Sequence, residues 1–187
     1  MQRLCLVLAL LAIWSFPAFA AREVEGVLLQ ETLESNGQQL VLNGAGVRSK
    51  WFLDLYVAGL YLEEESTDAR EVIGADRPMV LRLDIISGLI SSKKMEEATR
   101  EGFRHAAATG YPAGAEQVDA FIDVFREEIK EGDRFELAYL PGEGVRVSKN
   151  GELRATLTGL PFKQALIAIW LGEQPAQQSL KQDLLGL

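Results

Sequence analysis

Residues 51–62 read WFLDLYVAGLYL, a run of aromatic and branched apolar residues that is long for a single β-strand. Successive side chains of a strand point to opposite faces, so alternate residues of this run share a face. One face would carry Phe52, Asp54, Tyr56, Ala58 and Leu60. The opposite face would carry Trp51, Leu53, Leu55, Val57 and Gly59.

Outward from this strand, the chain reads as strands, a pair of helices, more strands and a final helix. Ser35-Asn36-Gly37 is a turn cluster suited to a hairpin, and Asn150-Gly151 is a strong two-residue hairpin signal. The expected strands cover residues 24–30, 40–42, 79–86, 135–139, 145–147 and 153–157. The expected helices cover residues 91–108 and 115–129, and a last one runs from Pro161 to Gly172. Because strands and helices do not alternate, we predict an α+β fold with a mainly antiparallel sheet and helices packed on one side.

The first 20 residues have the composition of a secretory signal peptide. Arg3 precedes the unbroken apolar run LCLVLALLAI, and Ala18-Phe19-Ala20 forms an A-x-A cleavage site. The run is shorter than the roughly 20 residues of a comfortable membrane span. We therefore expect a signal peptide over residues 1–20 and a single domain over residues 21–187. That domain would be periplasmic or secreted, without a stable membrane span after cleavage; an uncleaved N-terminal anchor is the alternative.

Composition excludes several classes of function. Lys+Arg 19 against Asp+Glu 27 gives a net charge of −8, so a general basic surface for nucleic acid is not expected. One His and one Cys rule out a His/Cys zinc site and an intrachain disulfide. A carboxylate-only metal site stays open but has no supporting spacing. We expect no metal and no cofactor.

The segment Asn43-Gly44-Ala45-Gly46 superficially suggests a nucleotide-binding loop. It lacks a third glycine and opens onto a strand, so the glycines more simply permit a tight bend or the close approach of another backbone. Arg48 follows, and its guanidinium presents a fork suited to a carboxylate or enolate oxygen. In a cavity it could anchor an anionic head whose tail meets apolar walls. The alternative is a solvent-facing arginine at a junction.

Three segments together resemble the chalcone isomerase-like superfamily. Residues 44–62, GAGVRSKWFLDLYVAGLYL, carry a G-x-G-x-R turn and a strand ending in G-L-Y. Residues 120–128, AFIDVFREE, are similar to the second helix of that family. Residues 158–185, TGLPFKQALIAIWLGEQPAQQSLKQDLL, are similar to the C-terminal helix and "LG-x-x-P" close of its fatty-acid-binding branch. The resemblance implies an open-faced β-sandwich with a ligand cleft between a large sheet and a layer of helices.

The resemblance also implies roles for two residues. The arginine of the turn is Arg48, which faces the cleft in that family. It holds a phenolate oxygen in the enzymes and a fatty-acid carboxylate in the binding proteins. The position that is threonine in the enzymes and tyrosine in the binders is Tyr56. The enzymes also use a tyrosine and an asparagine at the start of the first helix, where residues 91–94 here read SSKK.

We therefore expect an exported, non-enzymatic protein that binds a small apolar anion, fatty-acid-like or polyphenol-like, through Arg48 and Tyr56. A first alternative is an intramolecular lyase of the chalcone isomerase type, with Arg48 as its catalytic residue. A second is a structural or partner-binding module of the cell envelope, in which Arg48 would be buried against a protein carboxylate such as Asp54 and no pocket would be large enough for a ligand. The oligomeric state stays open.

Overall fold

The computed structural model describes residues 20–187, so the expected signal peptide lies outside the described residues except for Ala20. Its centre is a seven-stranded antiparallel sheet whose strands follow one another in chain order. The strands are β3 (Thr32–Ser35), β4 (Gln38–Lys50), β5 (Leu53–Leu62), β6 (Met79–Ile85), β7 (Arg134–Leu140), β8 (Gly144–Lys149) and β9 (Glu152–Leu157).

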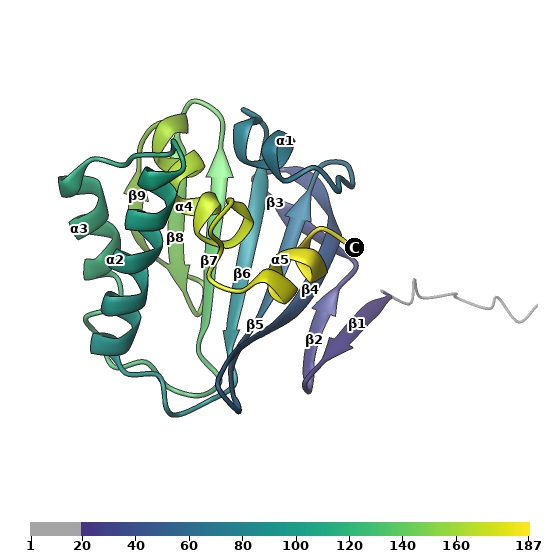
Figure 1. Cartoon of the computed structure of the whole chain (residues 1–187). Coiled ribbons are helices and arrows are strands. Elements are labelled where there is room, and N and C mark those ends of the chain that lie inside the picture. Colours follow the sequence, from purple (N-terminus) through teal and green to yellow (C-terminus); the bar gives the residue numbers. More distant parts are fainter. Residues whose placement is uncertain (1–19) are drawn as a thin grey trace, which may run out of the picture.

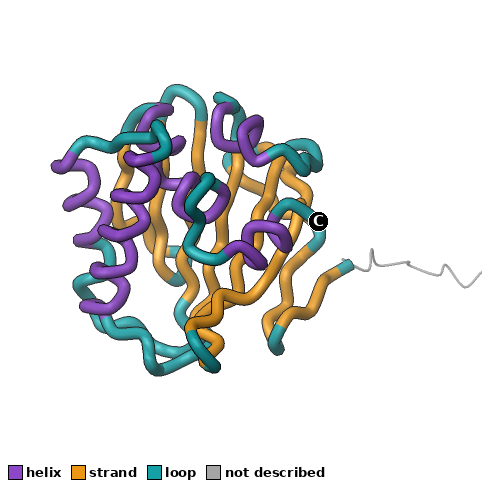
Figure 2. Tube along the Cα trace, viewed as in Figure 1, coloured by secondary structure: helices purple, strands orange, loops and turns teal. Residues whose placement is uncertain are grey.

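Helices cover one face of this sheet, as Figures 1 and 2 show. They are α1 (Ala69–Gly74), α2 (Ser92–Ala108), α3 (Ala115–Asp123), α4 (Leu160–Leu171) and α5 (Gln178–Leu184). Helix α4 is the most deeply buried and packs against β8, α1, α2 and α5, while α5 lies on β4 and β5. The prediction of an α+β fold, with a mainly antiparallel sheet and helices on one side, is confirmed.

The alternation predicted for residues 51–62 is confirmed within β5. Tyr56, Ala58 and Leu60 belong to the large core between the sheet and the helices. Val57 and Tyr61 belong to a smaller core on the opposite face of the sheet. The strand itself begins only at Leu53, because the two preceding residues form the turn of the β4–β5 hairpin.

The smaller core is closed by a separate hairpin of two strands, β1 (Ala21–Val24) and β2 (Val27–Gln30). The prediction of one strand over residues 24–30 was therefore wrong at its start. Glu25 and Gly26 both have positive φ, 46° and 76°, and reverse the chain in a two-residue turn. Leu29 of β2 is completely buried against the sheet.

The second predicted helix is shorter than expected. Residues 115–129 keep their apolar stripe, but α3 ends at Asp123 and the chain continues in turns. Phe125 and Ile129 are still buried in the large core. An apolar stripe therefore persists here although the backbone has left the helix. The short helices α1 and α5 were not predicted.

The glycines before Arg48 allow the close approach that the sequence predicts. A Cβ atom on Gly44 would overlap the carbonyl oxygen of Asp183, and one on Gly46 would overlap the Asp183 side chain. Helix α5 therefore rests directly on the backbone of β4. Asn43 completes this contact by donating to the carbonyl oxygen of Leu184 over 2.8 Å.

Candidate functional site

Arg48 and Tyr56 are brought together by the β4–β5 hairpin. They are direct partners in the antiparallel register, next to an irregularity between Arg48 and Ser49. Directly opposed residues of an antiparallel pair project to the same face of the sheet. Tyr56 belongs to the core beneath the helices, so both side chains lie on the helix-covered face. The two residues predicted from the sequence therefore lie next to each other on the same face of the sheet.

The guanidinium of Arg48 is half-buried and has no acidic partner. Its Nη1 atom donates to the carbonyl oxygen of Ser49 and, over 3.0 Å, to Oε1 of Gln177. Within residues 20–187 no carboxylate lies within 4.0 Å of the Arg48 guanidinium. Asp54, the acid considered for such a pair, accepts a hydrogen bond from the Ser49 hydroxyl over 2.7 Å instead. The positive charge of Arg48 is therefore not neutralised by the described part of the chain.

Tyr56 places its hydroxyl inside the core. The residue is buried, and its hydroxyl accepts a 3.0 Å hydrogen bond from Nε1 of Trp170 on α4. Burial raises the pKa of the Tyr56 phenol, and the Trp170 hydrogen bond and the Arg48 charge only partly oppose that increase. The hydroxyl thus keeps its proton at neutral pH. Among the described residues no acceptor takes that proton, so it is available to a ligand oxygen.

Gln177, just before α5, covers the guanidinium. Its Oε1 atom accepts from Arg48 and, over 2.8 Å, from the backbone N–H of Ser49. Its Nε2 atom donates to the Val47 carbonyl over 3.2 Å and to the Ser179 hydroxyl over 2.7 Å. An amide oxygen thus lies where an anion's oxygen could receive the same two hydrogen bonds. Sequence reasoning missed both Gln177 and the role of Trp170.

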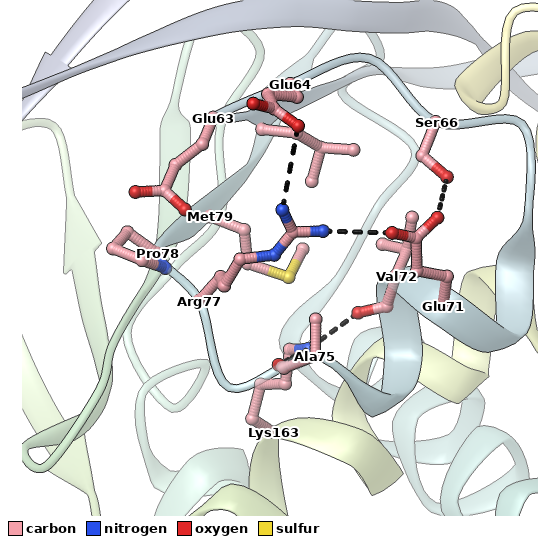
Figure 3. Close-up of a pocket in the computed structure, with 11 residues that line it drawn as sticks. Glu63, Glu64, Ser66, Glu71, Val72, Ala75, Arg77, Pro78, Met79 and Lys163 are labelled. Carbon is pink, nitrogen blue, oxygen red and sulfur yellow. Dashed lines mark hydrogen bonds and ion pairs between the residues drawn. The ribbon is translucent and has the colours of Figure 1, made fainter.

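Two hollows are present elsewhere in the described structure. One, of about 20 Å³, lies beside α1 and is lined by Arg77, Met79 and Lys163 among others (Figure 3). The other, of about 240 Å³, lies on the sheet face opposite the helices and includes Val80, Ala138 and Arg146. Neither is lined by Arg48 or Tyr56.

Comparison with known proteins identifies the family. The family model described as chalcone isomerase-like matches residues 21–186. The chain belongs to this chalcone isomerase-like family. A search of curated proteins finds no match. Among solved structures, the fold is similar to a fatty-acid binding protein of Arabidopsis thaliana. That likeness has a TM-score of 0.73 at 18% identity and covers 89% of this chain and 96% of that one.

The start of α2 differs chemically from what the resemblance implies for the enzymes of the chalcone isomerase-like superfamily. Ser91 caps the helix by accepting from the backbone N–H of Lys94 over 3.3 Å. The Ser92 hydroxyl donates to the carbonyl oxygen of Glu127 over 2.9 Å. Both hydroxyls are therefore used in holding α2 and the loop after α3 in place.

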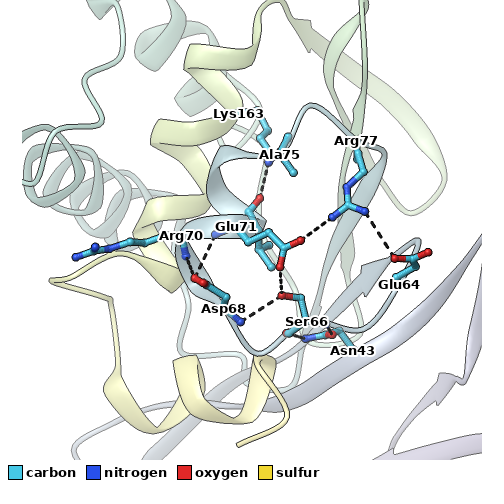
Figure 4. Close-up of polar contacts among 10 residues, drawn as sticks. Asn43, Glu64, Ser66, Asp68, Arg70, Glu71, Ala75, Arg77 and Lys163 are labelled. Atoms are coloured by element: carbon cyan, nitrogen blue, oxygen red, sulfur yellow. Dashed lines mark hydrogen bonds and ion pairs between the residues drawn. The ribbon is translucent and has the colours of Figure 1, made fainter.

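The charged cluster around α1 stabilises the fold of this chalcone isomerase-like domain. Asp68 caps α1, and Glu71 bonds both Ser66 and Arg77, as Figure 4 shows. Lys163 is 1% exposed, and its ammonium donates to the carbonyl oxygens of Val72, Ile73 and Ala75 over 2.6 to 2.9 Å. Burial lowers the pKa of Lys163 to about 8. With its hydrogen-bonding capacity satisfied, Lys163 anchors the end of α1 to α4.

The described residues also bear on metal binding and on membrane insertion. Across residues 20–187, no three His, Cys, Asp or Glu side chains are grouped so that they could hold a metal ion. No helix in that range combines the length and the apolar character needed to cross a bilayer.

Proposed function

We propose that the protein binds a small apolar anion, with a fatty acid as the best representative, at Arg48 and Tyr56. One observation carries this proposal. A half-buried guanidinium without a protein carboxylate lies opposite a buried tyrosine hydroxyl whose proton has no acceptor among the described residues. The solved fatty-acid binding protein with a similar fold supports the ligand class.

In this proposal the ligand carboxylate replaces the amide oxygen of Gln177. One carboxylate oxygen accepts hydrogen bonds from Nη1 of Arg48 and from the backbone N–H of Ser49. The other accepts a hydrogen bond from the Tyr56 hydroxyl. A charge-assisted hydrogen bond contributes about 1.5–3 kcal/mol, and each buried CH₂ of the tail about 0.8 kcal/mol. Because Gln177 covers the guanidinium of Arg48, we expect entry of the ligand to move the segment between α4 and α5 away from β4.

The test is calorimetric titration of the purified domain with laurate and with its uncharged methyl ester. We expect laurate to bind more tightly than the ester, and Arg48→Met to lower laurate affinity by about tenfold to a hundredfold. Arg70→Met is the matched control, because Arg70 is exposed and pairs with Glu173. Equal laurate affinity of Arg48→Met and the unaltered protein would refute the anchoring role.

We also propose that the protein acts outside the cytoplasm, in the periplasm or as a secreted protein. The support is the apolar run and the A-x-A site within residues 1–20. Expression of the full chain followed by fractionation and intact-mass measurement tests this point. A cytoplasmic product that retains Met1 would contradict it.

A further inference from the structure

The hairpin that carries Arg48 and Tyr56 ends in an exposed apolar tip. We define the tip as residues 50–53, Lys-Trp-Phe-Leu. Trp51 is 86% exposed, Phe52 is 100% exposed and Leu53 is 49% exposed. Trp51 also has a positive φ of 65°, which a bulky residue rarely adopts and which turns the chain at this point. Two large aromatic side chains are thus held in water by a strained turn.

A fourth exposed apolar residue lies at the same end of the molecule. Leu89, 51% exposed, is in the loop that leaves β6, the strand paired with β5. Figure 1 shows the β4–β5 hairpin and this loop together at the lower end of the molecule. Within residues 20–187, seven large hydrophobic residues are exposed, and four of them are Trp51, Phe52, Leu53 and Leu89. Such a concentration marks an interaction site rather than scattered exposure.

Uncompensated positive charge accompanies these residues. Among the described residues, Lys50 and Lys94 have no carboxylate within 4.0 Å, and Lys94 donates to the Leu89 carbonyl over 3.2 Å. Lys93 has only a 4.0 Å contact with Glu97.

The acids on the neighbouring loop after α3 are largely paired. Glu127 bonds Arg154 over 3.0 Å, and Glu128 bonds Lys130 over 3.2 Å. The positive charge of the lysines is partly offset by Asp54, directly after the tip, and by Glu131 on this loop, which have no cationic partner within 4.0 Å among the described residues, and the net charge of the whole protein is −8.

We propose that the tip docks on a lipid bilayer that contains anionic lipids, with Trp51 and Phe52 inserted at the interface and the lysines near the headgroups. Tryptophan favours this interface because its ring is apolar and its N–H is polar. Lysines beside the inserted residues add attraction to anionic lipids. The inference deepens the proposed function and rests on it, since a bilayer is where apolar anions accumulate.

The tip also lies close to the ligand site. Arg48 is two residues before Lys50 on the same strand, and at about 3.3 Å per residue it is roughly 10 Å from Trp51. A narrow hairpin end suits a fluid surface better than a protein partner, because a stable protein interface buries about 800 Å² on each side. Docking would place Arg48 just above the headgroups, within reach of a fatty-acid carboxylate.

Vesicle flotation tests the proposal on the chain that begins at Ala21. This chain avoids partitioning by the apolar run of residues 4–13, and it retains the whole of both cores. We expect it to bind vesicles of phosphatidylcholine with phosphatidylglycerol. The variant Trp51→Ser/Phe52→Ser should lower the partition coefficient by about tenfold or more. The control Leu187→Ser, which removes an exposed apolar residue at the C-terminus, far from the tip in Figure 1, should leave it unchanged.

Charge and ligand binding are measured separately. Lys50→Glu/Lys94→Glu should weaken binding to the mixed vesicles and abolish its salt dependence. The variants at Trp51/Phe52 and at Lys50/Lys94 should retain the laurate affinity of the parent in solution. Arg48→Met should bind laurate more weakly and still float with the vesicles. If the parent protein floats with the vesicles but does not bind laurate, the proposed function is refuted and the docking proposal is retained.

The docking proposal is overturned if the parent does not float with the mixed vesicles, or if Trp51→Ser/Phe52→Ser floats equally well. It is also overturned if that variant converts a dimer to a monomer in sedimentation while flotation is unchanged, because the tip would then contact a second copy.

Discussion

Nη1 of Arg48 and Oε1 of Gln177 are 3.0 Å apart, although 129 positions of sequence separate the two residues. The C-terminal segment thereby covers the one charged side chain on which ligand anchoring would depend. Under the proposed function, ligand binding is a competition between the amide oxygen of Gln177 and an external anion for Arg48.

Converting the internal amide to an acid should inhibit ligand binding. Gln177→Glu places a carboxylate on Arg48 and satisfies the guanidinium from within. We expect laurate affinity in calorimetry to fall by about tenfold or more, because the ligand must displace a charged partner. Gln178→Glu is the control: it adds the same charge one position along, on an exposed side chain. Equal affinities in the two variants would count against the competition.

The contact between β4 and α5 should not tolerate a larger residue. In Gly44→Ala the new methyl group would overlap the Asp183 carbonyl oxygen, so α5 must shift. We expect urea unfolding to show a loss of about 3 kcal/mol in the free energy of unfolding. Gly74→Ala, where nothing lies within 4 Å of the added atom, should change it by no more than about 1 kcal/mol. Similar effects at both glycines would contradict the close packing.

Stability at alkaline pH should depend on the hydrogen bond that the Tyr139 hydroxyl donates to the Asp76 carboxylate. Burial and this carboxylate raise the pKa of Tyr139 to about 12 from an ordinary value of 10.0. A folded pKa above the unfolded one gives stability that is present below pH 10 and is lost as pH rises toward 12.

The comparison for this effect is Tyr139→Phe, measured by urea unfolding across that pH range. Below pH 10 the variant should be less stable by about 1–2 kcal/mol. The difference should shrink between pH 10 and pH 12, because only the parent loses the contribution. A constant difference would show that the hydroxyl does not titrate as inferred.

Cyclisation of a chalcone should not be accelerated. The hydroxyls of Ser91 and Ser92 are engaged in holding α2, so the start of this helix does not supply the tyrosine and asparagine that the resemblance implies for the enzymes, and the groups that would organise charge in a transition state are incomplete. We expect the absorbance of added chalcones to decay at the buffer rate from neutral to mildly basic pH. Acceleration that disappears in Arg48→Ala would instead establish a lyase.

Local sequence patterns predicted the parts of the fold that depend on neighbours in the chain. The period of two in residues 51–62 assigned Val57 to one face of the sheet and its neighbours Tyr56 and Ala58 to the other, and the two faces carry separate cores. Gly44 and Gly46 indicated a close approach because the absence of a side chain leaves room for another backbone.

Contacts between distant segments left no such pattern. Nothing near Gln177 indicates that its amide meets Arg48, and Trp170 was predicted only as one residue of an apolar helix face. The turn at Glu25 and Gly26 was missed because glutamate rarely adopts positive φ, and here the packing of Leu29 against the sheet offsets that cost. The arginine and the tyrosine could be proposed because residues 44–62 resemble a motif of the chalcone isomerase-like superfamily that implies a role for both positions.

The order of the sheet has a consequence for biosynthesis. Strands β3 to β9 pair in the order in which a ribosome makes them, so the sheet needs no segment from the end of the chain. Arg48 and Tyr56 are both in place once β5 is made, whereas Gln177 and α5 emerge last. A nascent or truncated chain would therefore present Arg48 uncovered, and completion of the C-terminus would be the step that makes the protein selective.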